Sequence, residues 1–402
     1  MCPAWPRNNR KQAVPSATQS LHIKGRRLLP IVQGGMGVGV SAHRLAGNVA
    51  LAGAVGTLSS VDLRRHHHDL MHETARSRDK EVIDRANLIA LDREIQAATT
   101  IAAGNGMIAV NIMRAVSEYA ASVRRACESG AQAIVVGAGL PLDLPDLTAA
   151  YPGVALIPIL SDSRGIAIVL KKWLRKSRLP DAIVIEHPGR AGGHLGAAKI
   201  EDVNDARFEF PRVLEETFAV MRELGIERES LPLIPAGGIS TPEKVRELFA
   251  LGAAAVQVGT PFAVTEESDA HVNFKKVLAE ATPADIVTFM SVAGLPARAV
   301  KTPWLEKYLN KLPVLLQRAN PRAGCTLAFD CLEQCGLRDG NARAGQFCID
   351  HHLAAALAGD VERGLFFRGA GALPFGKHIR PVRELIDYLL QGVMPADLQA
   401  AG

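Results

Sequence analysis

The chain has 402 residues, of which 48% are hydrophobic and 22% charged, and its formal net charge is +5. This composition is typical of a globular protein with room for one large α/β domain and a smaller one. The modest positive charge suits an anionic ligand but excludes the concentrated basic surface of nucleic-acid-binding proteins. Apolar runs also stay far below the roughly 20 residues that a membrane helix needs.

The N-terminal residues and the cysteines indicate the cellular compartment of the protein. Residues 1–20 contain several prolines and basic side chains but lack the apolar stretch of a signal peptide, so we expect a disordered leader. The chain holds six cysteines, and without a secretory signal we expect these thiols to stay reduced. We therefore expect a cytoplasmic protein whose partners include neither nucleic acid nor membrane.

Strand-like segments recur along the chain, and each ends in glycine, serine or another polar residue. Val, Ile and Ala run through them without alternation, which is typical of parallel strands buried on both faces. The strand-like segments span residues 30–33, 54–59, 107–111, 133–136, 155–160, 182–186, 233–236 and 253–258. Helical patterns between them span residues 42–52, 80–102, 116–129, 164–176, 210–224 and 242–251.

Alternation of eight strands with helices predicts an α/β fold, a (β/α)8 TIM barrel, which we place at residues 21–265. The alternative is an open doubly wound sheet, but no Gly-x-Gly-x-x-Gly fingerprint follows the first strand in its usual context. Helical patterns continue at residues 266–281, 345–359 and 380–390. We expect residues 266–402 to form a mainly helical C-terminal extension packed on the barrel.

Two segments, residues 63–78 and 195–212, exceed normal loop lengths and follow predicted strands. Both are expected at the C-terminal face of the barrel, where long loops usually shape active sites. The first contains His66, His67 and His68. Because adjacent side chains do not converge on one ion, we expect a solvated loop there and not a metal site.

Two glycine turns lie one helix apart near residue 250. Gly237 and Gly238 follow the seventh predicted strand, and Gly259 and Thr260 follow the eighth. The loops after these two strands of a TIM barrel commonly bind phosphate. Glycine lets the backbone approach the phosphate, and helix N-terminal N–H groups supply hydrogen-bond donors. The paired turns therefore predict a phosphorylated ligand.

His194 follows Gly192 and Gly193 just after the sixth predicted strand. The glycines make this loop open and closely approachable at the ligand-binding face of the barrel. An imidazole can exchange a proton near neutral pH, so the position favours a catalytic histidine. The alternative is a histidine that only caps a turn.

Five motifs together resemble the nitronate monooxygenase family, also called the 2-nitropropane dioxygenase family. They are Pro-Ile-Val-Gln-Gly-Gly-Met-Gly at 30–37, Val-Asn-Ile-Met at 110–113, Ala-Gly-Gly-His at 191–194, Ala-Gly-Gly-Ile at 236–239 and Gly-Thr-Pro-Phe at 259–262. The resemblance implies an FMN-binding TIM barrel in which flavin carries the electrons and the protein supplies positioning and one titratable group. The implied substrates are a small alkyl nitronate and O2.

The resemblance also implies a role for each matching residue. The FMN phosphate would be held by Gly237, Gly238, Gly259 and Thr260. The flavin ring would lie against Gln33, Gly34, Gly35 and Met36, with a hydrogen bond from Asn111, and Gly192 and Gly193 would complete the cofactor site. His194 would be the catalytic residue.

One departure from the family concerns the loop before His194. Many members have glutamine or glutamate followed by glycine, seven and six residues before the histidine. Here these positions are His187 and Pro188, with Glu186 one step earlier. A one-residue insertion would explain the difference, so the flavin contact at Glu186 or His187 is left unassigned.

Two other functions fit the same residues. One is an NAD(P)H-dependent reductase of quinones or enoyl thioesters on the same flavin barrel. The other is a TIM-barrel enzyme with a phosphorylated ligand and no flavin, although no predicted strand carries a catalytic lysine. The physiological substrate, the use of NAD(P)H and the oligomeric state, with a homodimer as one option, are left open.

Four cysteines lie close together in the C-terminal region, namely Cys325, Cys331, Cys335 and Cys348, and His351 and His352 follow them. A structural zinc or iron–sulfur site is one interpretation, and a redox-active pair is another. Because the segment lacks the Cys-x2-Cys pair typical of such sites, we expect free thiols in the extension and no metal.

Overall fold

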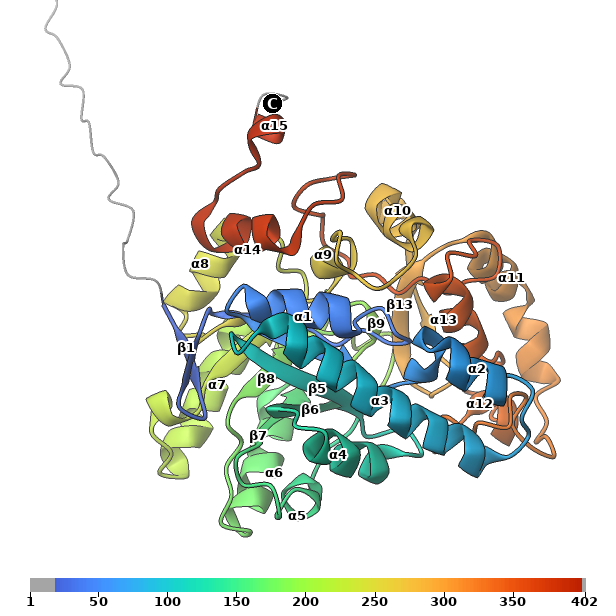
Figure 1. Ribbon diagram of the computed structural model, residues 1–402, viewed down its shortest axis with the longest axis horizontal. Coiled ribbons are helices and arrows are strands. Elements are labelled where there is room, and N and C mark those ends of the chain that lie inside the picture. Colours follow the sequence, from blue (N-terminus) through green and yellow to red (C-terminus); the bar gives the residue numbers. More distant parts are fainter. Residues whose placement is uncertain (1–18, 400–402) are drawn as a thin grey trace, which may run out of the picture.

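The computed structural model describes residues 19–399, so residues 1–18 of the expected leader lie outside the described residues. At its centre eight parallel strands form a closed barrel (Figure 1). The last strand pairs with the first, which confirms the predicted barrel and excludes the open sheet. In chain order the strands are β3 (Ile31–Gln33), β4 (Val55–Ser59), β5 (Met107–Met113), β6 (Ala133–Gly137), β7 (Ala155–Leu160), β8 (Ile183–Glu186), β10 (Leu233–Ala236) and β11 (Val256–Val258).

Helices surround the barrel and begin where the sequence supplies a capping side chain. In the first turns of α3 (Lys80–Ala102), α6 (Ser163–Leu174) and α8 (Pro242–Ala250), backbone N–H groups donate to the side chains of Asp79, Asp162 and Thr241, respectively. Such caps satisfy donors that the helix itself leaves unpaired. The helices of this layer are α1 (His43–Leu51), α3 (Lys80–Ala102), α4 (Tyr119–Glu128), α5 (Leu144–Leu147), α6 (Ser163–Leu174), α7 (Phe210–Glu223) and α8 (Pro242–Ala250).

A hairpin that the sequence did not reveal closes the N-terminal end of the barrel. Its strands, β1 (Leu21–Ile23) and β2 (Arg26–Leu28), pair in antiparallel fashion and bury Leu21 and Leu28 among the inward-facing barrel side chains. Arg26 Nη1 donates to the carbonyl oxygen of Gly106, directly before β5, at 3.1 Å. The hairpin leaves the C-terminal end of the barrel for a ligand.

Residues 63–78 form helices, so the expected solvated loop is wrong for most of this segment. The helices are η1 (Leu63–His66) and α2 (His68–Thr74). His66 Nε2 lies 2.8 Å from the carbonyl oxygen of Gly39, and His67 Nε2 lies 3.0 Å from Glu94 Oε1. Two of the three histidines thus bind other parts of the fold, and only His68 is exposed.

The C-terminal segment contains helices and also two strands that the sequence analysis missed. β12 (Ile286–Met290) and β13 (Pro296–Val300) form a hairpin, and β13 also pairs with β9 (Gly193–His194). Proline, alanine and arginine occupy four of the five positions of β13, so its composition does not signal a strand. The helices here are η4 (Pro283–Asp285), α9 (Thr260–Ala263), α10 (Val272–Glu280), α11 (Pro303–Gln317), α12 (Gly336–Asp339), α13 (Ile349–Leu357), α14 (Val382–Gln391) and α15 (Ala396–Gln399).

The helix α14 belongs to the layer around the barrel. It packs against α8 and α1 (Figure 1), and Leu385 and Leu389 are buried in the same hydrophobic cluster as the barrel helices. The outer layer thus takes its last helix from near the C-terminal end of the described chain, and the polypeptide between α9 and α14 lies over the ligand-binding end of the barrel. Within residues 19–399 no helix is both long and apolar enough to span a membrane.

Candidate active site

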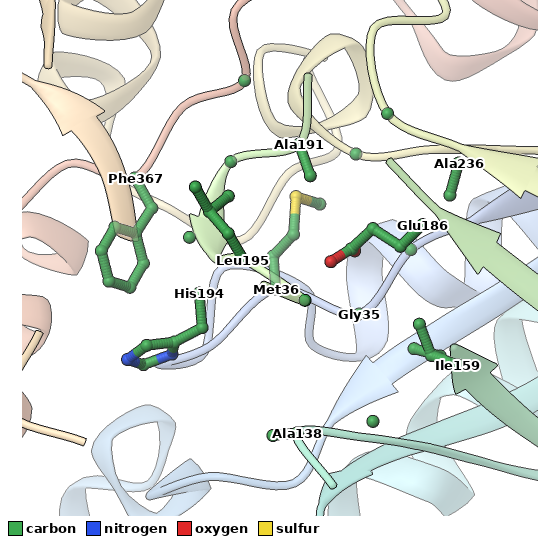
Figure 2. A pocket seen from close by; sticks show the side chains of 18 of the residues that line it. Gly35, Met36, Ala138, Ile159, Glu186, Ala191, His194, Leu195, Ala236 and Phe367 are labelled. Atoms are coloured by element: carbon green, nitrogen blue, oxygen red, sulfur yellow. The ribbon is translucent and has the colours of Figure 1, made fainter. Parts of the chain in front are cut away.

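A cavity of about 630 Å3 lies at the C-terminal ends of the barrel strands (Figure 2). Its size is within the range of roughly 300–1,000 Å3 that is usual for small-molecule sites. All of the site residues that the sequence analysis named, with the exception of Gln33, line this cavity: Gly34, Gly35, Met36, Asn111, Gly192, Gly193, His194, Gly237, Gly238, Gly259 and Thr260. The structure therefore brings together motifs that lie up to 226 residues apart, from Gly34 to Thr260.

The two glycine turns form one end of the cavity. Gly237 and Gly238 have φ angles of 104° and 70°, in the left-handed region where a side chain causes strain. A Cβ on Gly238 would also lie 3.0 Å from the Cβ of Arg190. Backbone alone can therefore form this wall, which leaves its N–H groups open to a ligand.

A third glycine loop lies against these turns and was not recognised from the sequence. The backbone N–H of Gly369 donates to Thr260 Oγ1 at 3.0 Å, and a Cβ on Gly371 would lie 3.5 Å from the Cα of Gly238. Both glycines line the cavity. The Gly-Ala-Gly sequence at 369–371 was the available signal, but nothing local places it beside residues more than 100 positions earlier.

Gly35 and Asn111 meet in the cavity wall at the end of β3 and β5. A Cβ on Gly35 would lie only 2.3 Å from the Cβ of Asn111, so the amide side chain can occupy its place only because residue 35 is glycine. Gln33 has a structural role, because its buried side-chain amide forms hydrogen bonds with both the N–H and the carbonyl oxygen of Thr57 on the neighbouring strand. Gln33 does not line the cavity and joins β3 to β4.

His194 lies on β9, and its side chain projects into the cavity (Figure 2). Its Nε2 is 2.7 Å from the hydroxyl oxygen of Ser291, and its ring packs edge-on to Phe367 with ring centres 5.5 Å apart. Burial lowers the pKa of His194 to about 4, so the imidazole is neutral near pH 7. Ser291 and Phe367 come from the C-terminal segment, and sequence reasoning missed both.

The structure separates the roles of Glu186 and His187. Glu186, at the end of β8, lines the cavity and points into it (Figure 2), and burial raises the pKa of its carboxyl to about 7. His187 points away, because its Nε2 lies 3.3 Å from Glu209 and its Nδ1 accepts the N–H of Gly189. Glu186 therefore lies in the cavity. This is the position that the glutamine or glutamate of other family members would take if the loop here has one extra residue after Glu186.

Arg298 holds the loop that carries His194. Its buried guanidinium donates from Nη1 to the carbonyl oxygens of Pro188 and Ala191, and its backbone pairs with Gly193 across β13 and β9. The charge of Arg298 also acts on Glu186, whose pKa it lowers against the larger effect of burial. Arg298 thus fixes both ends of the turn between Glu186 and His194.

Arg190 is the one lysine or arginine among the cavity-lining residues in the described part of the chain. Its Nη2 lies 2.9 Å from Glu209, and its aliphatic part lies against Gly238. A cation beside the glycine turns is suited to an anionic group bound there.

The four C-terminal cysteines Cys325, Cys331, Cys335 and Cys348 carry free thiols. Burial raises the pKa of Cys331, which lines the cavity, well above its usual value, so it stays protonated. Among residues 19–399 no group of three or more His, Cys, Asp or Glu side chains is arranged to hold a metal ion.

Curated relatives match about 30% of the chain. The chain is 34% identical to a nitronate monooxygenase of Pseudomonas aeruginosa over 120 residues, which is 30% of this chain and 31% of that protein. The aligned stretches span only 30–33% of the length of three curated relatives, from Saccharomyces cerevisiae, Bacillus subtilis and Pseudomonas aeruginosa.

Solved structures share the fold over most of the chain. FabK from Thermotoga maritima has a TM-score of 0.62 and 22% identity, with 90% of this chain and 91% of that chain covered. A nitroalkane oxidase from Streptomyces ansochromogenes has a TM-score of 0.60 and 19% identity, with 92% and 97% covered.

The family comparison covers almost the whole described chain. The sequence model of the nitronate monooxygenase family matches residues 21–392, from the first strand of the N-terminal hairpin to just beyond the end of α14. This match includes the barrel, the glycine turns, His194 and the segment that carries Ser291 and Phe367. The chain belongs to the nitronate monooxygenase family, a family of flavin-dependent enzymes.

Proposed function

We propose that this protein is an FMN-dependent oxidoreductase of the nitronate monooxygenase type, which oxidises alkyl nitronates with O2. The observation that supports this most is the neutral His194 in the same cavity as the paired glycine turns. The turns suit the phosphate of a cofactor, and the histidine suits the reacting end of a substrate. Nitronate, flavin and histidine would then share one space.

The residues present fit FMN. Gly237, Gly238, Gly259 and Thr260 would hold its phosphate, with Arg190 as the counter-charge. Gly34, Gly35 and Met36 would lie against the flavin ring beside Asn111, and the Cβ that residue 35 lacks would occupy space filled by that side chain. FMN would supply the electron transfer, and the protein would supply binding, orientation and electrostatics.

His194 would orient the substrate by donating a hydrogen bond to it. Its Nε2 is occupied by the Ser291 hydroxyl, and its Nδ1 has no hydrogen-bond partner among residues 19–399. A neutral imidazole protonated at Nδ1 can donate to a nitronate oxygen, because Ser291 can donate its own proton to Nε2. Ser291 is fully buried, which excludes water from its hydrogen bond to the imidazole and strengthens that bond.

The reaction can be tested by removing the imidazole. His194→Ala should leave FMN bound but lower the turnover of an alkyl nitronate about 10²–10⁴-fold, the usual loss of acid–base assistance. Steady-state oxygen uptake with nitronate measures turnover, and the flavin absorbance of the same sample measures bound cofactor. Loss of flavin with normal turnover per bound flavin would show that His194 belongs to the cofactor site instead.

Anaerobic mixing distinguishes the reductase alternative. The flavin of a nitronate monooxygenase should bleach with nitronate and persist with NADH, whereas rapid bleaching by NADH alone indicates a reductase of quinones or enoyl thioesters. A protein that binds no flavin after reconstitution with FMN would support the non-flavin phosphate enzyme.

We also propose a cytoplasmic location and a homodimer as the form to test first. The location is supported by the five free cysteines among the described residues, since such thiols persist in reducing compartments. Sedimentation of the purified protein would measure the oligomeric state.

A further inference from the structure

Four of the six cysteines lie in the long connection between α11 and α13, at residues 318–348. The regular structure of this connection is one turn of helix, α12 (Gly336–Asp339), and an isolated bridge between Leu332 and Val116. Connections longer than about 12–15 residues with so little secondary structure are uncommon in compact domains, and those that occur are often functional. The irregular backbone is therefore a reason to ask what its cysteines bind.

The fold brings these cysteines together although up to 23 residues separate them: Cys325, Cys331, Cys335 and Cys348. Cys331 and Cys335 pack against one hydrophobic cluster. This cluster includes Phe347 and Ile349, the two chain neighbours of Cys348. The pKa of the Cys331 thiol is raised mainly by burial and further by the charges of Asp350 and of the other three cysteines. All three therefore lie near Cys331.

The exposure of the four thiols differs from that of a cysteine used for packing. Each of the four side chains is half-buried, whereas Cys127 on α4 is buried in the hydrophobic core around the barrel. A free cysteine that acts as a small apolar residue is usually buried. Four half-buried thiols in one place instead favour a common ligand.

The arrangement of the thiols selects the kind of ligand. Four cysteine thiolates bind either a zinc ion or an iron–sulfur cluster. In the part of the chain that the structure describes, no three His, Cys, Asp or Glu side chains are arranged around one ion, as a tetrahedral zinc site would require. In a [4Fe–4S] cluster each thiolate binds a different iron, so its sulfur ligands surround a larger group.

Charged residues beside the thiols balance one another. Asp350 pairs with Arg65, which also pairs with Asp62, and Asp62 pairs in turn with Arg64. Two carboxylates and two guanidinium groups thus offset each other. These residues add no net negative charge beside a cluster whose thiolate ligands are themselves anionic.

We propose that a [4Fe–4S] cluster is bound by the four cysteines of this connection, in place of the free thiols expected from their spacing: Cys325, Cys331, Cys335 and Cys348. Each thiol loses its proton when it binds iron, and the positive charge of the irons offsets the thiolates. Cys331 also lines the cavity, so the cluster lies beside the site proposed for FMN. The inference stands on the C-terminal segment and does not depend on the proposed function.

The test begins with the full-length wild-type protein, purified without oxygen. A second sample is reconstituted anaerobically with ferrous iron, sulfide and a thiol reductant. Chemical analysis should find about four iron and about four acid-labile sulfide per chain. Electron paramagnetic resonance after reduction with dithionite should show the unpaired electron of a reduced cluster, and it distinguishes the cluster from fully reduced flavin, which has no unpaired electron.

Serine variants identify the ligands. Cys335→Ser and Cys348→Ser should each lose most of the iron, the sulfide and the resonance signal. Cys127→Ser is the matched control, because its thiol lies on α4 away from the connection, and it should keep all three. The flavin content of each variant reports whether the barrel has folded, and the wild-type analysis needs no variant.

The outcomes separate the cluster from the proposed function. Wild-type protein without iron and sulfide after reconstitution, about one zinc per chain in their place, or unchanged iron in both Cys335→Ser and Cys348→Ser would overturn the cluster. Iron and sulfide at the expected content without oxidation of any nitronate would overturn the proposed function and support the cluster. Oxidation of nitronates by a reconstituted protein that holds no iron would do the reverse.

Discussion

Replacing His194 with asparagine should remove a pH-dependent part of the protein's stability. Burial lowers the pKa of His194 from 6.5 to about 4. Between these values the unfolded chain binds a proton that the folded protein does not, so the free energy of unfolding falls as the pH falls through this window. At about pH 5 the lost stability amounts to about 2 kcal/mol, and it approaches about 3 kcal/mol below about pH 4.

Urea unfolding of the apoprotein at about pH 7.5 and about pH 5 measures this loss. Between these pH values the free energy of unfolding should fall by about 2 kcal/mol more in the wild-type protein than in His194→Asn. His352 offers a matched control, because burial also lowers its pKa to about 4 while its ring stacks on Trp304 outside the cavity lining. His352→Asn should remove a similar term and leave nitronate turnover intact. A difference below about 0.5 kcal/mol between wild-type and His194→Asn would refute the buried neutral imidazole, since the expected term is several times larger.

Three further substitutions test the site. Gly238→Val should abolish flavin binding, because residue 238 has a φ angle of 70° and its Cβ would lie 3.0 Å from Arg190; retained flavin absorbance after gel filtration would contradict this. Arg190→Met should weaken FMN binding about 10–100-fold, the usual cost of a lost charged hydrogen bond, whereas the exposed Arg212→Met should not, as flavin titration would measure. Arg298→Met should lower nitronate turnover about 100-fold by freeing the loop before His194, with partial rescue in Arg298→Lys. Lower stability with unchanged kcat and KM would show that Arg298 has no positioning role.

The parts of the fold that the sequence predicted are those where the local pattern and the tertiary environment agree. Eight apolar runs marked the barrel strands because both faces of a parallel strand are buried. Lys80 and Ala102 were recognised as the ends of α3, where Asp79 supplies the cap. The hairpin at the N-terminal end and the strand β13 were missed, since residues such as Arg26 and Arg298 act as strand residues only because of the partners they meet.

The residue types alone indicated which backbone could approach a ligand and which side chain could exchange a proton. Glycine at 237 and 238 and histidine at 194 carry that information in their own covalent structure, independent of any neighbour. The groups around them become visible only in the folded chain: Ser291 bonds the imidazole, Arg298 holds its loop, and Glu186 lines the cavity where His187 does not. These contacts arise because β13 pairs with β9 about 100 residues away, and pairing at that separation depends on the packing of the whole chain.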